Sequence, residues 1–254
     1  MSARAGAVVQ AASVRAMRAP AGASVRRLID TGTGAGGLGD GLVRRLIDVP
    51  PGARFGANSA VAGELCFVID GGGRCEVEGF GSLPLEPDRG VWLPPGSAYL
   101  LAAGSKGDLR VDIVSLPVTS PAGAADPALS GDRPAAGPPQ ARDLHDCAVE
   151  TTGDRRFRVL FGPGYGCSVA TQFVGEIPPG RAPAHSHPYD EVVLILRGEG
   201  VIHVGGGEHP LAPGTCAHLP PGEPHCLENT GPGLMRVLGV FHPADSPAAK
   251  LAHG

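Results

Sequence analysis

Three histidines and one glutamate are the residues of this chain whose types and spacing could do chemistry. His185 and His187 stand two apart, Glu191 opens a Val/Leu/Ile run, and His225 follows a Pro- and Gly-rich turn. Alternate residues of a β-strand point to one face, so positions 185, 187, 189 and 191 are predicted to share a face. The turn can bring His225 over from a neighbouring strand. Three imidazoles and a carboxylate suit Fe, Mn, Ni, Co or Zn, and an octahedral ion with four such ligands keeps two positions for substrate or dioxygen.

Tyr189 is a further ionisable residue on this predicted face. A phenol beside a bound metal is a candidate proton donor, so Tyr189 is the predicted catalytic residue. The alternative role is a ring that packs at the mouth of a barrel. Gln172 lies on the strand ahead of the histidines, and it lines the site only if its side chain faces inward, which the sequence does not determine.

The elements that must position these residues are expected to be short β-strands. The chain has 254 residues, of which 40 are glycine and 26 are proline, and 42% are hydrophobic. That much glycine and proline is unsuited to a helical bundle and is typical of strands joined by tight turns. No segment shows a convincing 3.6-residue periodicity. The predicted fold class is therefore all-β.

The two halves of the chain carry an internal repeat. Three landmarks recur, namely the Pro-Pro-Gly turns at 50–52 and 178–180, the Glu-led apolar runs at 64–69 and 191–196, and the Pro-Pro-Gly turns at 94–96 and 220–222. The offsets of 128, 127 and 126 residues keep nearly one register. Two tandem β-barrels are predicted.

A Pro/Ala/Gly-rich stretch without apolar periodicity separates the two repeats and is predicted to be a linker. The predicted division of the chain is an N-terminal arm, a first barrel, the linker and a second barrel, at residues 1–24, 25–117, 118–142 and 143–254.

Two segments of the second half resemble the two sequence motifs of the cupin family. The first is Gly180-x4-His185-x-His187-x3-Glu191-x6-Gly198, one residue shorter than usual after its first glycine. The second is Gly214-x5-Pro220-x-Gly222-x2-His225-x3-Asn229, which matches at every position. The resemblance covers about 50 residues and, through the repeat, implies a bicupin of two jelly-roll barrels. In that family the residues matching His185, His187, Glu191 and His225 bind one metal ion, and Asn229 is expected to hold its loop by hydrogen bonds.

The first barrel lacks this ligand set. No histidine precedes His145, and by register Asn58, Ala60 and Tyr99 stand where the ligand histidines would be, with only Glu64 kept. One carboxylate among neutral groups does not hold a transition metal tightly. The first barrel is predicted to be degenerate and structural, with a metal-free pocket for an organic ligand as the alternative.

The resemblance implies a mononuclear metal-dependent enzyme. The first hypothesis is a non-haem dioxygenase-type oxidoreductase that uses Fe or Mn and acts on a small carbonyl- or enol-bearing substrate. The second is metal-assisted chemistry without redox change, by an isomerase, lyase, aminohydrolase or polyketide cyclase. Bicupin ureidoglycine aminohydrolases match in size, but their ligand pattern differs from His185-x-His187. The third is a metabolite-binding protein without catalysis.

Charge and composition restrict the partners. A formal net charge of −4 gives no electrostatic footprint for nucleic acid. No run of 18 apolar residues is present, so no membrane span is expected. Six cysteines without a C-x-x-C pair, and a start without an apolar signal core, predict a cytoplasmic protein. Five arginines and no acid in residues 1–27 leave a transit peptide as the alternative to a simple arm. The resemblance implies a homodimer.

Overall fold

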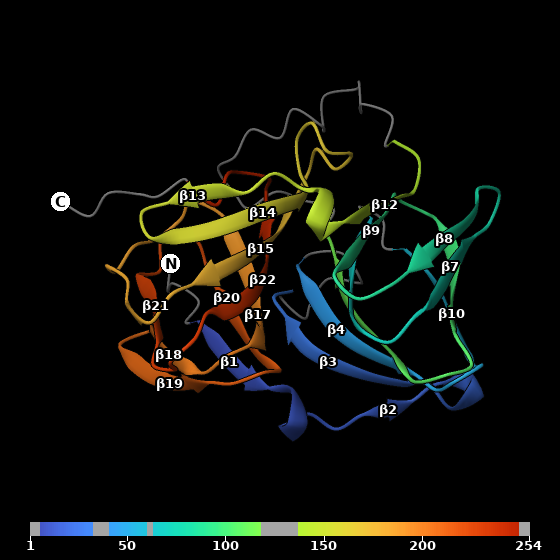
Figure 1. Ribbon diagram of the computed structural model, residues 1–254, viewed down its shortest axis with the longest axis horizontal. Helices are drawn as coiled ribbons and strands as arrows, with labels where there is room; N and C mark the ends of the chain where they lie inside the picture. The colour runs from blue at the N-terminus through green and yellow to red at the C-terminus, as the bar shows by residue number, and fades with distance from the viewer. Residues whose placement is uncertain (1–5, 33–40, 60–62, 118–136, 249–254) are drawn as a thin grey trace.

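Two β-barrels, one in each half of the chain, make up the structure in Figure 1, a computed structural model that describes residues 6–32, 41–59, 63–117 and 137–248. Each barrel is built from a seven-stranded and a four-stranded antiparallel sheet. Three short 3-10 turns, at Ala11–Ser13, Pro20–Gly22 and Leu144–Asp146, are the helical elements of the described residues. The predicted all-β fold of two tandem jelly-roll barrels is confirmed.

The first barrel joins a seven-stranded sheet of order β12-β9-β6-β11-β4-β3-β2 to a four-stranded sheet of order β5-β10-β7-β8. Its strands are β2 (Met17–Arg18), β3 (Ser24–Asp30), β4 (Val43–Val49), β5 (Arg54–Asn58), β6 (Glu64–Asp70), β7 (Gly73–Val77), β8 (Gly81–Leu85), β9 (Arg89–Leu93), β10 (Ala98–Ala103) and β11 (Leu109–Ser115).

The second barrel repeats this plan with sheets of order β1-β20-β17-β22-β15-β14-β13 and β16-β21-β18-β19. Its strands from the second half are β13 (Glu150–Thr152), β14 (Arg155–Phe161), β15 (Thr171–Ile177), β16 (Gly180–Arg181), β17 (Asp190–Arg197), β18 (Gly200–Val204), β19 (Gly207–Leu211), β20 (Thr215–Leu219), β21 (His225–Asn229) and β22 (Met235–His242).

Each seven-stranded sheet includes an edge strand from the segment of chain that leads into the other barrel. β1 (Ala7–Gln10), at the start of the chain, pairs with β20 of the second barrel, and β12 (Gln140–Asp143) pairs with β9 of the first. The predicted arm therefore includes a strand that lies on the distant barrel, and β12 comprises the last residues predicted as linker together with Asp143. Residues 118–136 of that linker lie outside the described residues.

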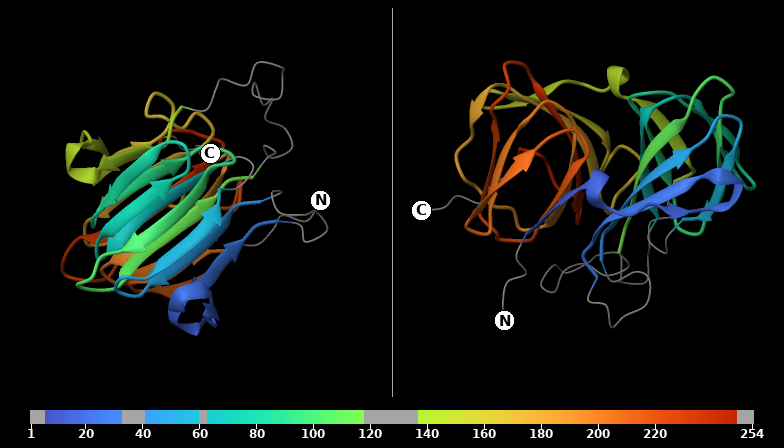
Figure 2. Two further views of the ribbon diagram at one scale, coloured as in Figure 1. Left: turned by 90° about the vertical axis from the view of Figure 1, so that its right-hand side faces the viewer. Right: turned by 90° about the horizontal axis from the view of Figure 1, so that it is seen from below.

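Within the seven-stranded sheets, β6 and β17 are apolar at consecutive positions because both of their faces are buried. Alternate residues of β6 and β17 point into their own barrel, at Cys66, Val68, Val193 and Ile195. The residues between them join one core shared by both barrels, at Leu65, Phe67, Val192 and Leu194. Figure 2 shows the barrels side by side with these sheets facing each other.

A buried ion pair of the first barrel faces the second barrel. Arg44 donates from Nε and Nη2 to the Asp112 carboxylate at 2.8 and 2.9 Å, and neither side chain is exposed. The same guanidinium donates to the carbonyl oxygens of Val192 and Leu238 in the second barrel, at 2.9 and 3.2 Å. A charge buried this deeply needs both its partner and its hydrogen bonds, so Arg44 ties the first barrel to two strands of the second.

All six cysteines are buried and unpaired, as expected for small residues of a reduced core. In the described segments, no helix has the length and apolar character that crossing a membrane requires.

Candidate metal centre

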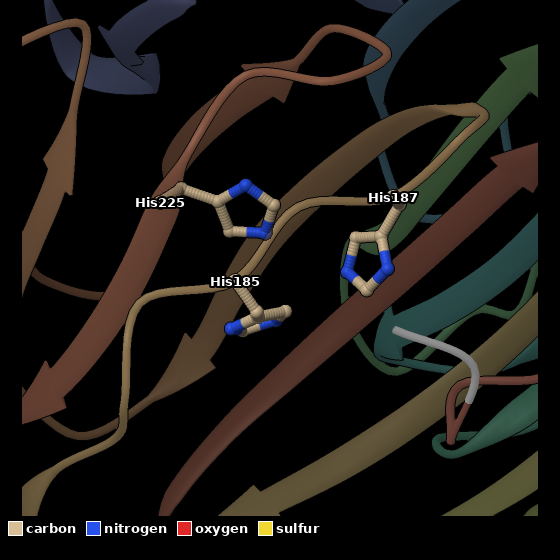
Figure 3. Close-up of side chains that lie close together, drawn as sticks. All are labelled: His185, His187 and His225. Atoms are coloured by element: carbon tan, nitrogen blue, oxygen red, sulfur yellow. The ribbon is translucent and has the colours of Figure 1, made fainter. Parts of the chain in front are cut away.

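The structure brings the three predicted histidine ligands together at one end of the second barrel. His185 and His225 form a two-residue antiparallel bridge, with reciprocal N–H to C=O hydrogen bonds of 3.0 and 2.9 Å. His187 follows two residues later, and the three rings face one another (Figure 3). Ring centroids are 4.7 to 5.2 Å apart, and one ligand atom from each ring lies within 4.8 Å of the others. This spacing could hold a single metal ion.

Each imidazole is oriented through its Nδ1 atom. The Nδ1 atom of His185 lies 3.2 Å from the Pro183 carbonyl oxygen, and that of His225 lies 2.9 Å from the Glu223 carbonyl oxygen. Carbonyl oxygens only accept, so both Nδ1 atoms carry the proton and Nε2 carries the lone pair. Such outer hydrogen bonds fix both the tautomer and the ring orientation of metal-binding histidines.

Tyr189 orients the third ring. Its hydroxyl lies 3.0 Å from Nδ1 of His187 and donates to the Ser246 carbonyl oxygen at 3.4 Å. With its own proton directed to Ser246, the phenol oxygen accepts from Nδ1 of His187. The Tyr189 ring is buried and stacks on His187 with centroids 4.8 Å apart. The structure therefore places Tyr189 behind a ligand, as a positioning residue, while its predicted role as proton donor stays a prediction.

Glu191, the fourth predicted ligand, lies beside the histidine cluster. Its Oε2 atom is 3.5 Å from Nε2 of His187, but the mutually close set contains the three histidines only. Burial raises the pKa of Glu191 to about 8, against the opposing charges of Arg155 and Arg44. A desolvated carboxylate of this kind is stabilised by a nearby cation, which fits a role as metal ligand.

The local backbone differs from the predicted continuous strand over 185–191. The chain bends at Pro188 and Tyr189, and β17 begins at Asp190. Proline lacks the N–H that a strand ladder needs, so Pro188 interrupts the pairing. Tyr189 stacks on His187 and does not line the cavity.

A cavity of about 80 Å³ adjoins the histidines and Glu191. Most of its wall is apolar or aromatic, formed by Phe157, Phe173, Ile177, Val193, Leu227, Val237 and Phe241. Two arginines, Arg155 and Arg156 of β14, also line it. Neither arginine was predictable from the sequence, because both belong to no motif and precede His185 by about 30 residues.

Gln172 and Asn229, two further residues singled out from the sequence, have different surroundings. Gln172 does not line the cavity. It is fully buried, and its side chain lies next to Gly90 of the first barrel. A Cβ added to that glycine would be 3.0 Å from Oε1 of Gln172. Asn229 donates from Nδ2 to the carbonyl oxygens of Ile177 and Gly233 and accepts from the N–H of Gly231, so its predicted role of holding its loop is confirmed.

The first barrel holds an ion pair in the corresponding place. Glu64 is 1% exposed and accepts hydrogen bonds from Arg45 at 2.5 Å, from Ser115 at 2.7 Å and from Tyr99 at 2.7 Å. The carboxylate is thus neutralised by a cation of the chain itself. Asn58 ends β5 beside Ala98, and Ala60 lies outside the described residues.

Tandem double-sheet barrels, one of them with a histidine cluster inside, define the class of bicupin folds. The sequence family described as "Cupin domain" matches residues 173–241, which include the whole cluster and Glu191. The second barrel is therefore a cupin domain.

One curated relative and several solved structures are similar to this chain. The "Oxalate-binding protein" of Thermotoga maritima is 37% identical over 68 residues, which are 26% of this chain and 56% of that protein. The match thus spans little more than half the length of that relative.

The similarity to solved structures extends over nearly the whole chain. Protein YlbA from E. coli has a TM-score of 0.73 at 13% identity, with 95% of this chain and 93% of that chain covered. Lactobacillus farciminis oxalate decarboxylase, in a formate complex, has a TM-score of 0.72 at 15% identity, with 96% and 88% covered. Identities this low establish the shared fold alone.

Proposed function

We propose that this chain is a mononuclear metal-dependent bicupin enzyme, of the non-haem Fe or Mn dioxygenase type, that acts on a small carbonyl- or enol-bearing substrate. The proposal depends on the cluster of three histidines beside the cavity, each oriented through Nδ1 and with ligand atoms within 4.8 Å of one another. A metal bound there supplies Lewis acidity and, as Fe or Mn, redox chemistry. We assign Zn, Ni and Co as the other metals that suit these ligands.

The cavity limits the substrate to a small molecule. Pockets for drug-sized ligands measure roughly 300–1,000 Å³, whereas this cavity measures about 80 Å³. A ligand of only a few heavy atoms fits such a volume. The aromatic walls also keep water away from the reacting atoms, which strengthens the electrostatic interactions made there.

Metal analysis followed by oxygen uptake tests the dioxygenase proposal. Plasma mass spectrometry of protein purified without an affinity tag or chelator is expected to find about one Fe or Mn per chain. The protein would then be assayed with small 2-oxo acids and enolisable diketones in an oxygen electrode. Turnover that is unchanged under strict anaerobiosis would rule out the dioxygenase.

A second candidate is a metal-assisted lyase without net redox change. It is supported by the similarity of the whole chain to oxalate decarboxylases and of its site-bearing segment to an oxalate-binding protein. Oxalate is a dianion of six heavy atoms and suits the small cavity. Product analysis separates the candidates, because a lyase consumes oxalate without stoichiometric oxygen uptake, and a binding protein leaves oxalate unchanged.

We also propose that the protein is a cytoplasmic homodimer. The support is the family resemblance and the reduced, buried cysteines. Light scattering of the purified protein measures the subunit number directly, and a monomer at micromolar concentration would contradict the dimer.

A further inference from the structure

We propose that Arg155 is the specificity-determining residue of the cavity, a fixed cationic anchor that selects substrates with a carboxylate group. This inference rests on the proposed function of the same site, because it gives the metal-bound molecule a second point of attachment. Arg155 opens β14, and its side chain is half-buried on the cavity side of that strand, as is the buried ring of Phe157. No sequence motif includes it.

The environment of Arg155 distinguishes it from the arginine beside it. Arg156 is exposed and pairs with Glu176 at 3.2 Å. Arg155, by contrast, makes no ion pair with a carboxylate of the described residues. Its Nη2 donates to the carbonyl oxygen of Leu227 at 3.1 Å, and Leu227 lies on β21, two residues after His225. This hydrogen bond holds the guanidinium at the strand that carries a metal ligand.

The guanidinium of Arg155 is also partly removed from water. Burial lowers its pKa, and the carboxylates of Asp154 and Glu191 are among the charges that oppose this shift. A cation in an apolar, weakly hydrated cavity interacts more strongly with an anion than a surface arginine does. The cost of burying it is offset when an anionic ligand enters.

The chemistry of the side chain indicates a carboxylate. A guanidinium is a rigid planar fork of N–H donors that matches the two oxygens of a carboxylate. With one donor used by Leu227, the other N–H groups remain for a ligand. A small molecule with one oxygen group on the metal at the histidine cluster and a carboxylate on Arg155 is held at both ends.

If Arg155 acts on Glu191 and not on the substrate, its removal should change metal binding and not ligand affinity. Arg155 is the first charge that lowers the pKa of Glu191, so it could serve only to keep that carboxylate ionised for the metal. Loss of Arg155 would then reduce metal retention and leave the affinity of the metal-loaded protein for anions unchanged. Metal content and ligand affinity must therefore be measured separately.

The test compares wild type with Arg155→Met, Arg155→Lys and the control Arg158→Met. Arg158 lies on the same strand, outside the cavity lining. Each protein is loaded with Mn²⁺, its metal content is measured before and after titration, and oxalate and its uncharged isostere oxamide are titrated in by calorimetry. We expect Arg155→Met to bind oxalate about 10- to 100-fold more weakly, with unchanged metal content and little change for oxamide. Arg155→Lys should recover part of the affinity, and Arg158→Met should match wild type.

Each contrary result has its own meaning. Wild-type protein that takes up neither Mn²⁺ nor Fe²⁺ would overturn the proposed function itself. Metal-loaded wild type that binds oxalate no better than Arg155→Met does would overturn the role of Arg155 and leave the metal centre standing. Loss of metal from Arg155→Met, with normal oxalate affinity in its loaded fraction, would assign Arg155 to Glu191 instead.

Discussion

The two barrels share a fold and a buried glutamate but differ in what surrounds that glutamate. Glu64 and Glu191 hold matching places in the two barrels. Glu64 pairs with Ser115, the last residue of β11, and Glu191 pairs with Phe241, the next-to-last residue of β22. Glu64 pairs with Arg45 and accepts hydrogen bonds from Ser115 and Tyr99. Glu191 has the histidine cluster beside it instead.

The replacements explain the difference. The repeat offset of 128 residues places Phe173 where the first barrel has Arg45. The Phe173 and Phe241 rings pack with centroids 4.8 Å apart, where the first barrel has the polar Arg45 and Ser115. A Cβ at Gly239 would lie 2.1 Å from the Phe173 ring, so the glycine makes room for it. Under the proposed function, a metal ion in the second barrel takes the role that Arg45 has in the first.

The largest effect is expected when a histidine is removed. His187→Ala or His225→Ala should abolish metal retention while the barrel stays folded, because the strands have their own apolar core. Metal content by plasma mass spectrometry and circular dichroism measure the two properties. Full metal stoichiometry in both variants would contradict the site.

The next largest effect is expected at Arg44, which pairs with Asp112 and donates hydrogen bonds to the second barrel. Arg44→Met leaves Asp112 buried without its cation and should lower the free energy of unfolding by about 3–5 kcal/mol. The matching positions of the second barrel, by the repeat, are Gln172 and Leu238, which carry no charge. Urea denaturation measures the loss, and Arg44→Met combined with Asp112→Leu should recover most of it. A single variant as stable as wild type would show that the pair does not join the barrels.

The stability of the metal-free protein should depend on pH through Glu191. The folded-state pKa of Glu191 is raised to about 8 by burial, so the metal-free fold binds a proton that the unfolded chain releases near pH 4.5. Its contribution to stability is therefore present at low pH and is lost as pH rises through about 8. Metal-free wild type should lose a few kcal/mol over this range relative to Glu191→Gln. Parallel stability curves for the two proteins would contradict this.

A smaller effect is expected behind the ligands. Tyr189→Phe removes the acceptor for Nδ1 of His187, and loss of such an outer partner typically weakens metal binding about 10- to 100-fold. Competition with a metal-chelating dye measures the affinity. An unchanged affinity would mean that packing alone orients the His187 ring.

No effect on metal is expected from the first barrel. Glu64→Gln should leave the metal content unchanged, because Glu64 serves only the internal network with Arg45. Its loss should still lower the melting temperature, which differential scanning calorimetry detects. A fall in metal content would show that the first barrel also takes part in metal binding.

Much of this architecture was predictable because it repeats. The two Pro-Pro-Gly turns and the Glu-led run of each half locate both barrels, and the motif spacing identifies His185, His187 and His225. The missing N–H of Pro188 predicts the bend in principle. The alternating pattern of residues 185, 187, 189 and 191 instead favoured a continuous strand.

The other features depend on distant contacts. Arg44 and Arg45 are neighbours, and only the folded barrel decides that one faces the partner barrel and the other faces the interior. β1 pairs with a strand about 200 residues away, and Arg155 reaches the cavity from a strand without a motif. Local patterns carry no information about these partners.

We expect the second barrel to hold one metal ion and the first to hold none, and the metal content of the untagged protein decides between these barrels. Plasma mass spectrometry should find about one Fe or Mn per chain, lost in His225→Ala and kept in Glu64→Gln. No metal in wild-type protein, or equal loss in both variants, would contradict the account.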